Sequence, residues 1–304
     1  MVSRGYLVLS ALLVAGCVGL SVQAPGSAQP PAAPRYGPIQ ENWPGAVAYS
    51  ISDPGALPQG MNTGCGGNSG RERPVVLLNG AFLNKYATWS KAAPKLAAAG
   101  YCVFGLDYGT RIDGPFHQMG DLRRSAAEIG RFIDTVKART GAEKVDVVGY
   151  SEGGMVPFYL INELGGHTDI HTFVAVASPM RGMSFYGMLE WLAKVPGGRA
   201  LMNATVPAAA DGVKNSGYMR EIARNGLTRP GVNYVTISSR NDRVVALSES
   251  MLPPGPNVTN VVVQDHCPAA DVFHGRVPYD DTVIGLILHA LDPATAAKRV
   301  VASC

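Results

Sequence analysis

The sequence contains few charged residues, and their two signs nearly cancel. Only 16% of the 304 residues are Asp, Glu, Lys or Arg, and the formal net charge is +3. The chain has no run of Lys or Arg and no basic stretch interleaved with aromatic residues. Because nucleic-acid binding needs a concentrated basic surface, this composition excludes DNA or RNA as the main partner.

Motifs for metal ions and phosphate groups are also missing from the sequence. None of the five cysteines stands in a C-x-x-C pair, and no group of Cys and His has the spacing of zinc ligands. The glycine-rich segment 64–70 lacks the G-K-[ST] ending of a phosphate-binding loop and precedes an expected strand, not a helix. We therefore expect no metal ion and no cofactor.

The N-terminus has the pattern of an export signal. Arg4 is followed by the apolar run 6–22 and then by a stretch rich in Pro, Ala and Gln. The run is short for a transmembrane anchor and is interrupted by Ser and Gly. We expect residues 1–28 to be a signal peptide and residues 29–64 to be a linker or N-terminal extension.

Residues 14–17, Val-Ala-Gly-Cys, resemble a bacterial lipobox within this run. If the lipobox is used, the chain is cut before Cys17 and attached to the cell envelope through a lipid on that residue. The alternative is cleavage nearer Ala24 or Ala28, which would release a secreted protein. Both readings place the mature protein outside the cytoplasm.

Four cysteines remain once Cys17 is removed or lipidated. They are Cys65, Cys102, Cys267 and Cys304. An even number in an exported chain indicates disulfide bonds, and four cysteines can pair in three ways. Cys65 precedes one expected strand and Cys102 lies in the next, so these two are expected to be neighbours. We pair Cys65 with Cys102 and Cys267 with Cys304.

Expected strands and helices alternate through the rest of the chain. We expect strands at 73–78, 101–106, 144–148, 172–177, 232–238 and 258–263, and helices at 89–99, 121–140, 154–161 and 282–291. This alternation predicts an α/β domain over residues 65–304, with a mostly parallel sheet covered by helices on both faces. Residues 180–230 break the rhythm and hold five of the ten Met, which is typical of an adaptable cap or of ordinary core helices.

The pentapeptide Gly149-Tyr150-Ser151-Glu152-Gly153 stands between an expected strand and an expected helix. In a G-x-S-x-G turn of this kind, the serine hydroxyl projects clear of the sheet. The backbone is crowded there, so the positions two before and two after the serine must lack a side chain. Ser151 is therefore our candidate nucleophile, and the alternative is an ordinary serine in a glycine-rich turn.

A serine nucleophile needs a histidine to take its proton and an acid to orient that histidine. In this architecture the acid and then the histidine follow the serine along the chain. Asp242 comes after the expected strand 232–238, although it could instead pair with a neighbouring arginine. His266 and His274 both follow the last expected strand, and we favour His274 because it lies just ahead of the last helix.

Two backbone N–H groups are expected to bind the oxyanion of the reaction intermediate. One is that of Glu152, directly after the nucleophile, and the other is that of Ala81, in the loop after the first core strand. The carboxylate of Glu152 is unfavourable beside an oxyanion unless it points away or is paired. The alternative for this side chain is a glutamate that faces the N-terminal dipole of the following helix.

Several stretches of the sequence resemble the extracellular lipases of the α/β-hydrolase fold. Residues 140–154 are similar to the nucleophile turn of the small Bacillus-type class 2 lipases, and residues 239–242 are similar to their acid turn. Residues 274–283 match the spacing from their catalytic histidine to the last helix. The four cysteines resemble two disulfides of Candida antarctica lipase B, which favours the same pairing.

This resemblance implies a fold and a set of site residues. The fold is that of the α/β-hydrolases, and the residues are a catalytic triad and two oxyanion donors: Ser151, Asp242 and His274, with Ala81 and Glu152. The chain differs from these lipases at Asn79, where they usually carry His or Pro, and at Glu152, where they usually carry Met or Gln. Residues 180–230 match them poorly.

The sequence therefore predicts an exported serine hydrolase of lipid-like or medium-chain carboxylic esters. We expect a monomer that acts on a small ester or lipid and contacts a lipid interface. A cell-envelope acyltransferase with the same triad is one alternative. A surface-binding protein that keeps the fold without catalysis is another.

Overall fold

The computed structural model describes residues 33–64, 71–109, 114–184, 192 and 194–296. The expected signal peptide and Cys17 lie outside these residues, and so do Cys65 and Cys304. Cys102 and Cys267 are within them, and both are disulfide-bonded. Because their predicted partners are not described, the two pairings stay predictions.

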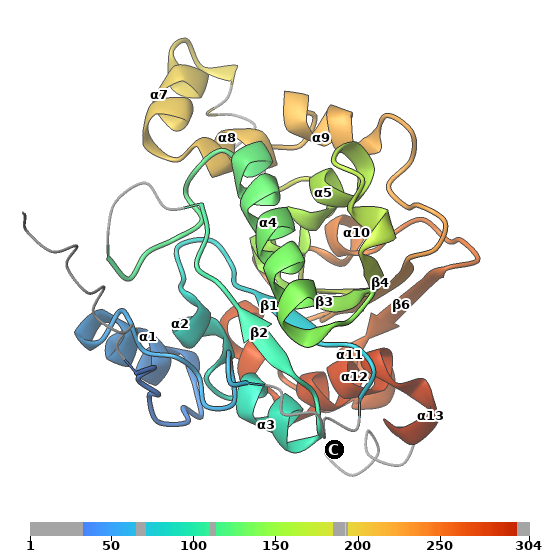
Figure 1. Ribbon diagram of the computed structural model, residues 1–304. Coiled ribbons are helices and arrows are strands. Elements are labelled where there is room, and N and C mark those ends of the chain that lie inside the picture. Colours follow the sequence, from blue (N-terminus) through green and yellow to red (C-terminus); the bar gives the residue numbers. More distant parts are fainter. Residues whose placement is uncertain (1–32, 65–70, 110–113, 185–191, 193, 297–304) are drawn as a thin grey trace, which may run out of the picture. The chain divides into compact units, whose positions relative to one another are not determined.

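Six strands form one sheet in which every neighbouring pair is parallel (Figure 1). The strand order is β2-β1-β3-β4-β5-β6, and the strands are β1 (Val75–Leu78), β2 (Val103–Gly105), β3 (Val145–Tyr150), β4 (Ile170–Val176), β5 (Asn233–Ser238) and β6 (Val258–Val262). Each lies within two residues of an expected strand at both ends. The predicted α/β fold with a parallel sheet is therefore confirmed.

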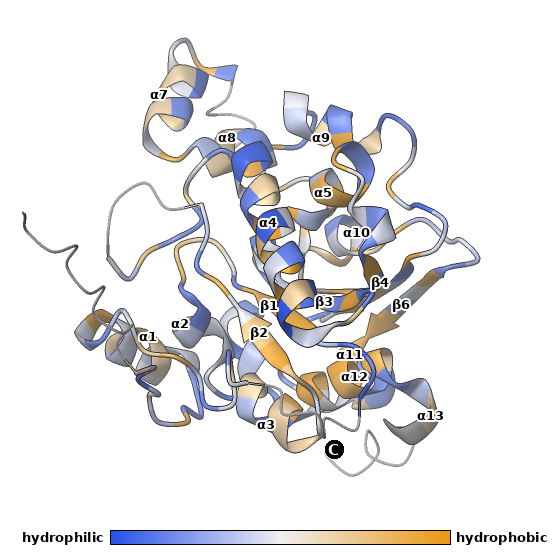
Figure 2. Ribbon diagram, viewed as in Figure 1, coloured by the Kyte–Doolittle hydropathy of each residue, from blue (hydrophilic) through white to orange (hydrophobic). Residues whose placement is uncertain are grey.

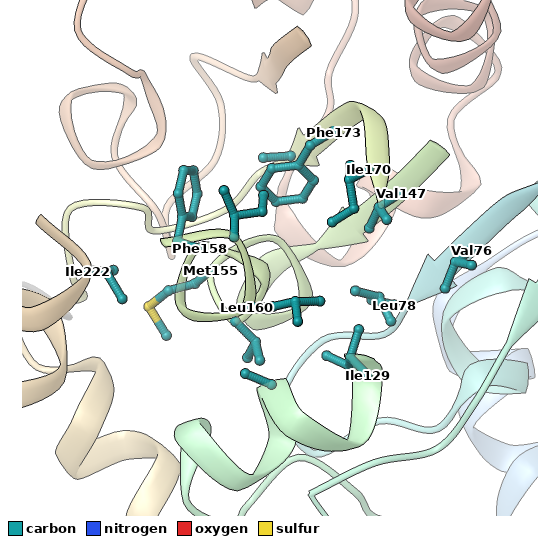
Figure 3. Close-up of a cluster of buried hydrophobic side chains, with 14 of the residues drawn as sticks. Val76, Leu78, Ile129, Val147, Met155, Phe158, Leu160, Ile170, Phe173 and Ile222 are labelled. Atoms are coloured by element: carbon teal, nitrogen blue, oxygen red, sulfur yellow. The ribbon is translucent and has the colours of Figure 1, made fainter. Parts of the chain in front are cut away.

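Successive side chains of a strand point to opposite faces of the sheet, and both faces are buried. Val76 and Leu78 of β1 enter a core with α4 (Leu122–Thr140) and α5 (Pro157–Glu163). Figure 3 shows part of this core, including Ile129 of α4 and Phe158 and Leu160 of α5.

The other face of β1 supplies Val75 and Leu77 to a second core. This core includes residues of α3 (Ala92–Ala98) and α12 (Asp281–Leu291). Burial on both faces explains why the strands read as nearly continuous apolar runs.

The long helix α4 has the amphipathic pattern that the sequence predicts. Its buried side chains recur three or four residues apart and are Leu122, Ser125, Ala126, Ile129, Ile133 and Val136. Figure 2 shows hydrophilic residues between these positions along the helix. Asp121 caps the first turn by accepting hydrogen bonds from two backbone N–H groups, and Gly141 ends the helix at a φ of 73°.

A helix that the sequence did not predict lies in the expected linker. Helix α1 (Trp43–Ser52) is capped by the Asn42 side chain and packs on α2 (Lys85–Trp89). The rings of Tyr49 and Tyr86 lie 4.9 Å apart at this contact. Only Ala46 and Ser50 of α1 are buried, so its sequence carries no apolar periodicity that would have indicated a helix. Part of the segment 29–64, which we expected to be a linker or N-terminal extension, is thus helical and packs on α2.

Part of the segment 180–230 belongs to the main core, which is one of the two roles that the sequence left open. In α9 (Gly217–Ala223), Tyr218 and Ile222 belong to the core formed with α4 and α5. Helices α7 (Gly198–Thr205) and α8 (Pro207–Gly212) share a small separate cluster with Val213, while Ala208 of α8 also belongs to the main core. Within this stretch, residues 185–191 and 193 are outside the described part of the chain.

Shorter elements connect these parts. They are η1 (Ser151–Gly154), η2 (Gly166–Thr168), α10 (Leu247–Ser250), α11 (Val263–His266), η3 (His274–Tyr279) and α13 (Pro293–Ala296). The expected helix at 89–99 is divided between α2 and α3. No helix within the described ranges is long and apolar enough to cross a lipid bilayer.

Candidate active site

A sharp turn joins β3 to η1 and carries Ser151. The φ of Ser151 is +53°, a left-handed conformation that is strained for a residue with a side chain. A Cβ atom on Gly149 would lie 2.1 Å from the carbonyl oxygen of Gly153. One on Gly153 would lie 2.5 Å from the carbonyl oxygens of Leu78 and Asn79. Both glycines of the motif are therefore required by contacts with backbone, as the sequence predicted.

The structure brings Ser151, His274 and Asp242 together. His274 Nε2 lies 3.0 Å from Ser151 Oγ, and His274 Nδ1 lies 2.7 Å from Asp242 Oδ2. A carboxylate can only accept, so Nδ1 carries the proton and Nε2 is left to accept from the serine hydroxyl. The other oxygen of Asp242 accepts from the backbone N–H groups of Val244 and Val245, at 2.8 and 3.0 Å. The acid is thus fixed in place from both sides.

The structure does not support the two alternatives considered from the sequence, namely Asp242 paired with a neighbouring arginine and His266 as the histidine of the site. Arg240 forms its ion pair with Asp265, at 2.6 Å, and not with Asp242. His266 is an exposed residue at the end of α11. The hydrogen bonds from a histidine ring to Ser151 and Asp242 are made by His274.

Tyr150 holds the loop that carries His274, a contact that sequence reasoning missed. Its hydroxyl donates to the backbone carbonyl of His274 at 2.9 Å. The two rings pack with their centroids 5.1 Å apart. An aromatic residue before the nucleophile was visible in the motif, but its partner 124 residues away was not.

The loop after β1 approaches the nucleophile closely. A Cβ on Gly80 would lie 3.1 Å from the Cβ of Ser151. Asn79 spans the loop by donating from its side chain to the carbonyl of Leu83 at 2.5 Å. The following N–H groups have acceptors, since Phe82 donates to His117 and Leu83 donates to Gly80. Among the described residues no acceptor is found for the N–H of Ala81, so this donor is available beside Ser151.

The Glu152 side chain is buried on the side away from the substrate cleft. The residue is 2% exposed, and its electrostatic neighbours are Asp211 of α8, Tyr218 of α9 and Tyr108. Its Oε1 atom has no hydrogen-bond partner among the described residues. Loss of hydration raises the pKa of this carboxyl well above its usual value near 4.5, and the negative charge of Asp211 adds to the effect. Burial therefore favours the uncharged acid form of Glu152.

A cleft of about 710 Å³ opens at Ser151 and His274. Four aromatic side chains around it are exposed, namely Trp43, Phe82, Phe116 and Phe273, by 40 to 53%. The other described residues that line it are Val47, Gly80, Ala81, Leu83, Tyr150, Arg243, Val244 and Gly275. Trp43 and Val47 come from α1, so the helix missed by sequence reasoning forms part of the wall. No described residue of the segment 180–230 lines the cleft.

The described residues contain no cluster of three or more His, Cys, Asp or Glu side chains that could hold a metal ion. The groups brought together at Ser151 are a histidine, an acid and backbone amides, which with the serine are the set used for acyl transfer.

The sequence of this site and its surroundings matches a known family. Residues 72–283, well over half of the chain, match the model described as Lipase (class 2). The chain belongs to the class 2 lipase family. The resemblance to the class 2 lipases that was inferred from the sequence is confirmed.

Solved structures similar to this class 2 lipase include lipase B of Aspergillus fumigatus. That comparison has a TM-score of 0.61 and 19% sequence identity, and it covers 80% of this chain and 60% of that one. The mature form of Bacillus licheniformis lipase BlEst2 gives a TM-score of 0.54 and 14% identity, over 72% of this chain and 92% of that one. At these identities the similarity shows the shared α/β-hydrolase fold.

A relative in sequence is the lysosomal thioesterase PPT2-B of Xenopus laevis. It is 26% identical over 129 residues, which are 42% of each chain. This class 2 lipase thus spans less than half the length of that thioesterase and about three fifths of the fungal lipase.

Proposed function

We propose that this protein is an exported serine lipase or esterase that forms an acyl-enzyme on Ser151. The observation that supports this most directly is the hydrogen-bond chain from Asp242 through His274 to Ser151, which ends in a largely apolar cleft. Family membership supports ester hydrolysis, and the site geometry supports the assignment of the nucleophile.

In the proposed reaction, Ser151 Oγ attacks the ester carbonyl while its proton passes to His274 Nε2. Asp242 stabilises the imidazolium that forms. The backbone N–H groups of Ala81 and Glu152 bind the oxyanion of the tetrahedral intermediate. Collapse of the intermediate breaks the bond to the alcohol, which takes the proton from His274. Water then attacks the acyl-enzyme by the same steps and releases the acid.

The shape and chemistry of the cleft favour an apolar acyl group. The cleft is lined by aliphatic and aromatic side chains, and its volume suits a ligand of medium size. The exposed aromatic residues Trp43, Phe82 and Phe273 lie around the opening, where they would also contact a lipid interface. We therefore propose lipid-like or medium-chain esters as substrates and a monomer as the active form.

The assignment is tested by hydrolysis of p-nitrophenyl esters of increasing acyl length. We expect Ser151→Ala to lower kcat by about 10⁴-fold or more, as removal of a serine nucleophile does. Ser184→Ala is a matched control, because this serine bonds Glu249 and does not line the cleft. A fluorophosphonate probe should label wild type and Ser184→Ala but not Ser151→Ala. Equal rates for wild type and Ser151→Ala would remove the nucleophile assignment.

The acceptor of the acyl group is decided by product analysis. If water is the acceptor, the free acid remains the product when the added alcohol is dilute relative to water. A dominant transesterified product with a dilute sugar or lipid alcohol would instead establish the acyltransferase. Absence of labelling by the probe in wild type would favour the non-catalytic surface-binding protein.

Export is proposed from the N-terminal pattern and has its own test. We expect mass spectrometry of the mature protein to find an N-terminus near residue 29 or a lipidated Cys17. In the second case, Cys17→Ser should abolish lipid attachment. A mature chain that keeps Met1 and its apolar run would contradict both forms of the proposal.

A further inference from the structure

Arg243 is the one permanently charged side chain among the described residues that line the cleft. It follows the proposed catalytic acid directly, and its neighbour Val244 lines the cleft as well. The remaining described lining residues are apolar, aromatic or small, apart from Ser151 and His274. The described part of the cleft therefore presents one permanent positive charge beside its apolar walls.

The Arg243 side chain is exposed and makes no hydrogen bond or ion pair with the part of the chain that the structure describes. The nearest acid in the sequence is occupied, because Asp242 is bound to His274 and to backbone N–H groups. Two nearby arginines differ in this respect. Arg240 pairs with Asp265, and Arg276 pairs with Asp280. The donors of Arg243 are thus available to a ligand in the cleft.

A guanidinium group binds carboxylates and phosphates in a two-pronged arrangement. Apolar surroundings strengthen such a contact, because they lower the local dielectric response. We propose that Arg243 binds an anionic group, a carboxylate or a phosphate, carried by the ester substrate. The acyl chain of the same molecule lies against the aromatic walls. This inference rests on the proposed esterase function and adds a charge preference to it.

The test compares anionic and neutral esters of the same size. One pair consists of the p-nitrophenyl monoester of a dicarboxylic acid and the p-nitrophenyl ester of the monocarboxylic acid with the same number of carbons. A second pair consists of a monoacylglycerol phosphate and the matching monoacylglycerol. The quantity measured is the ratio of kcat/KM for the anionic ester to that for the neutral ester. The pair that responds identifies a carboxylate or a phosphate as the bound group.

We expect Arg243→Gln to lower this ratio by about tenfold in at least one pair, which is the effect of losing a charge-assisted hydrogen bond. Arg243→Lys should keep part of the preference, because it keeps the charge but not the planar fork. Arg240→Gln is the matched control and should leave the ratio unchanged. Added salt should reduce the wild-type ratio, since the pair is exposed to solvent.

The same ratio in wild type and Arg243→Gln for both pairs overturns the inference while Ser151-dependent hydrolysis of the neutral ester stands. Hydrolysis that does not depend on Ser151, or no hydrolysis of any ester, overturns the proposed function and this inference with it. The two failures are therefore distinguishable by the neutral ester alone.

Discussion

Glu152 illustrates how burial changes the meaning of a single residue. In the sequence its carboxylate stands next to the proposed nucleophile, where a negative charge would oppose an oxyanion. In the structure it is buried near α8 and α9, and loss of hydration raises its pKa well above the usual value. Its backbone N–H can therefore serve the oxyanion, while burial disfavours a negative charge on its side chain.

The same burial makes stability depend on pH. Because the pKa of Glu152 is higher in the folded protein than its usual value near 4.5, the folded state binds more protons than the unfolded state in the range between the two values. The contribution of Glu152 to the stability of the folded state is therefore least unfavourable below pH 4.5. It becomes more unfavourable as pH rises from 4.5 towards the pKa of the folded state.

We predict that Glu152→Gln raises the free energy of unfolding relative to wild type at pH 8 and that this gain shrinks towards pH 4. Glutamine has nearly the same shape and never ionises. The measurement is urea-induced unfolding at several pH values. Glu143→Gln, at an exposed residue, is the control and should show no such trend. A gain that is the same at every pH would show that ionisation of Glu152 is not its cause.

A second prediction at the residue scale concerns Tyr150. Tyr150→Phe removes the hydroxyl that bonds the His274 carbonyl and keeps the ring against the imidazole. Loss of one neutral hydrogen bond suggests a fall in kcat of about three- to tenfold with KM little changed. Steady-state kinetics measure both parameters. Tyr218→Phe loses a similar bond, to the Val156 carbonyl, and should keep its kcat. If both variants lose kcat equally, Tyr150 has no specific positioning role.

At the scale of elements, the turn between β3 and η1 is the least tolerant part of the fold. We predict that Gly153→Ala destabilises the protein by about 1–3 kcal/mol or more and abolishes most activity. The added methyl would meet two backbone oxygens that cannot move independently of β1. Thermal unfolding and ester hydrolysis report the two effects. Gly217→Ala, in α9, has no atom nearer than 3.8 Å to the added methyl and should not destabilise.

These elements also show which parts of the structure could be predicted from the sequence. The strands were predictable because burial on two faces requires runs of apolar residues. The turn was predictable because its crowded backbone requires glycines. Helix α1 was not, since its contacts with Tyr86 and with the cleft depend on residues distant in the chain. The bond from Tyr150 to the His274 loop escaped for the same reason.

The proposed site was predictable to a similar degree. The order of serine, acid and histidine along the chain, together with the place of His274 just ahead of the last helix, selected the three residues that the structure brings together. The walls of the cleft were not, because they come from α1, from the loop after β1 and from the loops around Arg243 and Phe273. No single stretch of sequence carries that pattern.

At the scale of the whole molecule, disulfide bonds are expected to stabilise the folded chain. We predict that peptide mapping without reduction finds Cys65 bonded to Cys102 and Cys267 bonded to Cys304. Reduction should lower the free energy of unfolding by about 2–4 kcal/mol for each bond that is lost. Denaturant titration with and without a reductant measures this. A different pairing in the peptide map would contradict the prediction.

Because helix α1 forms part of the cleft wall, we expect the N-terminal segment to influence which substrates bind. A protease that trimmed the chain to Ser52 would remove Trp43 and Val47 from the cleft wall and leave the bonds among Ser151, His274 and Asp242 in place. We expect such an enzyme to remain active but to lose preference for longer acyl chains. Its acyl-length profile would then record how far the N-terminus had been trimmed.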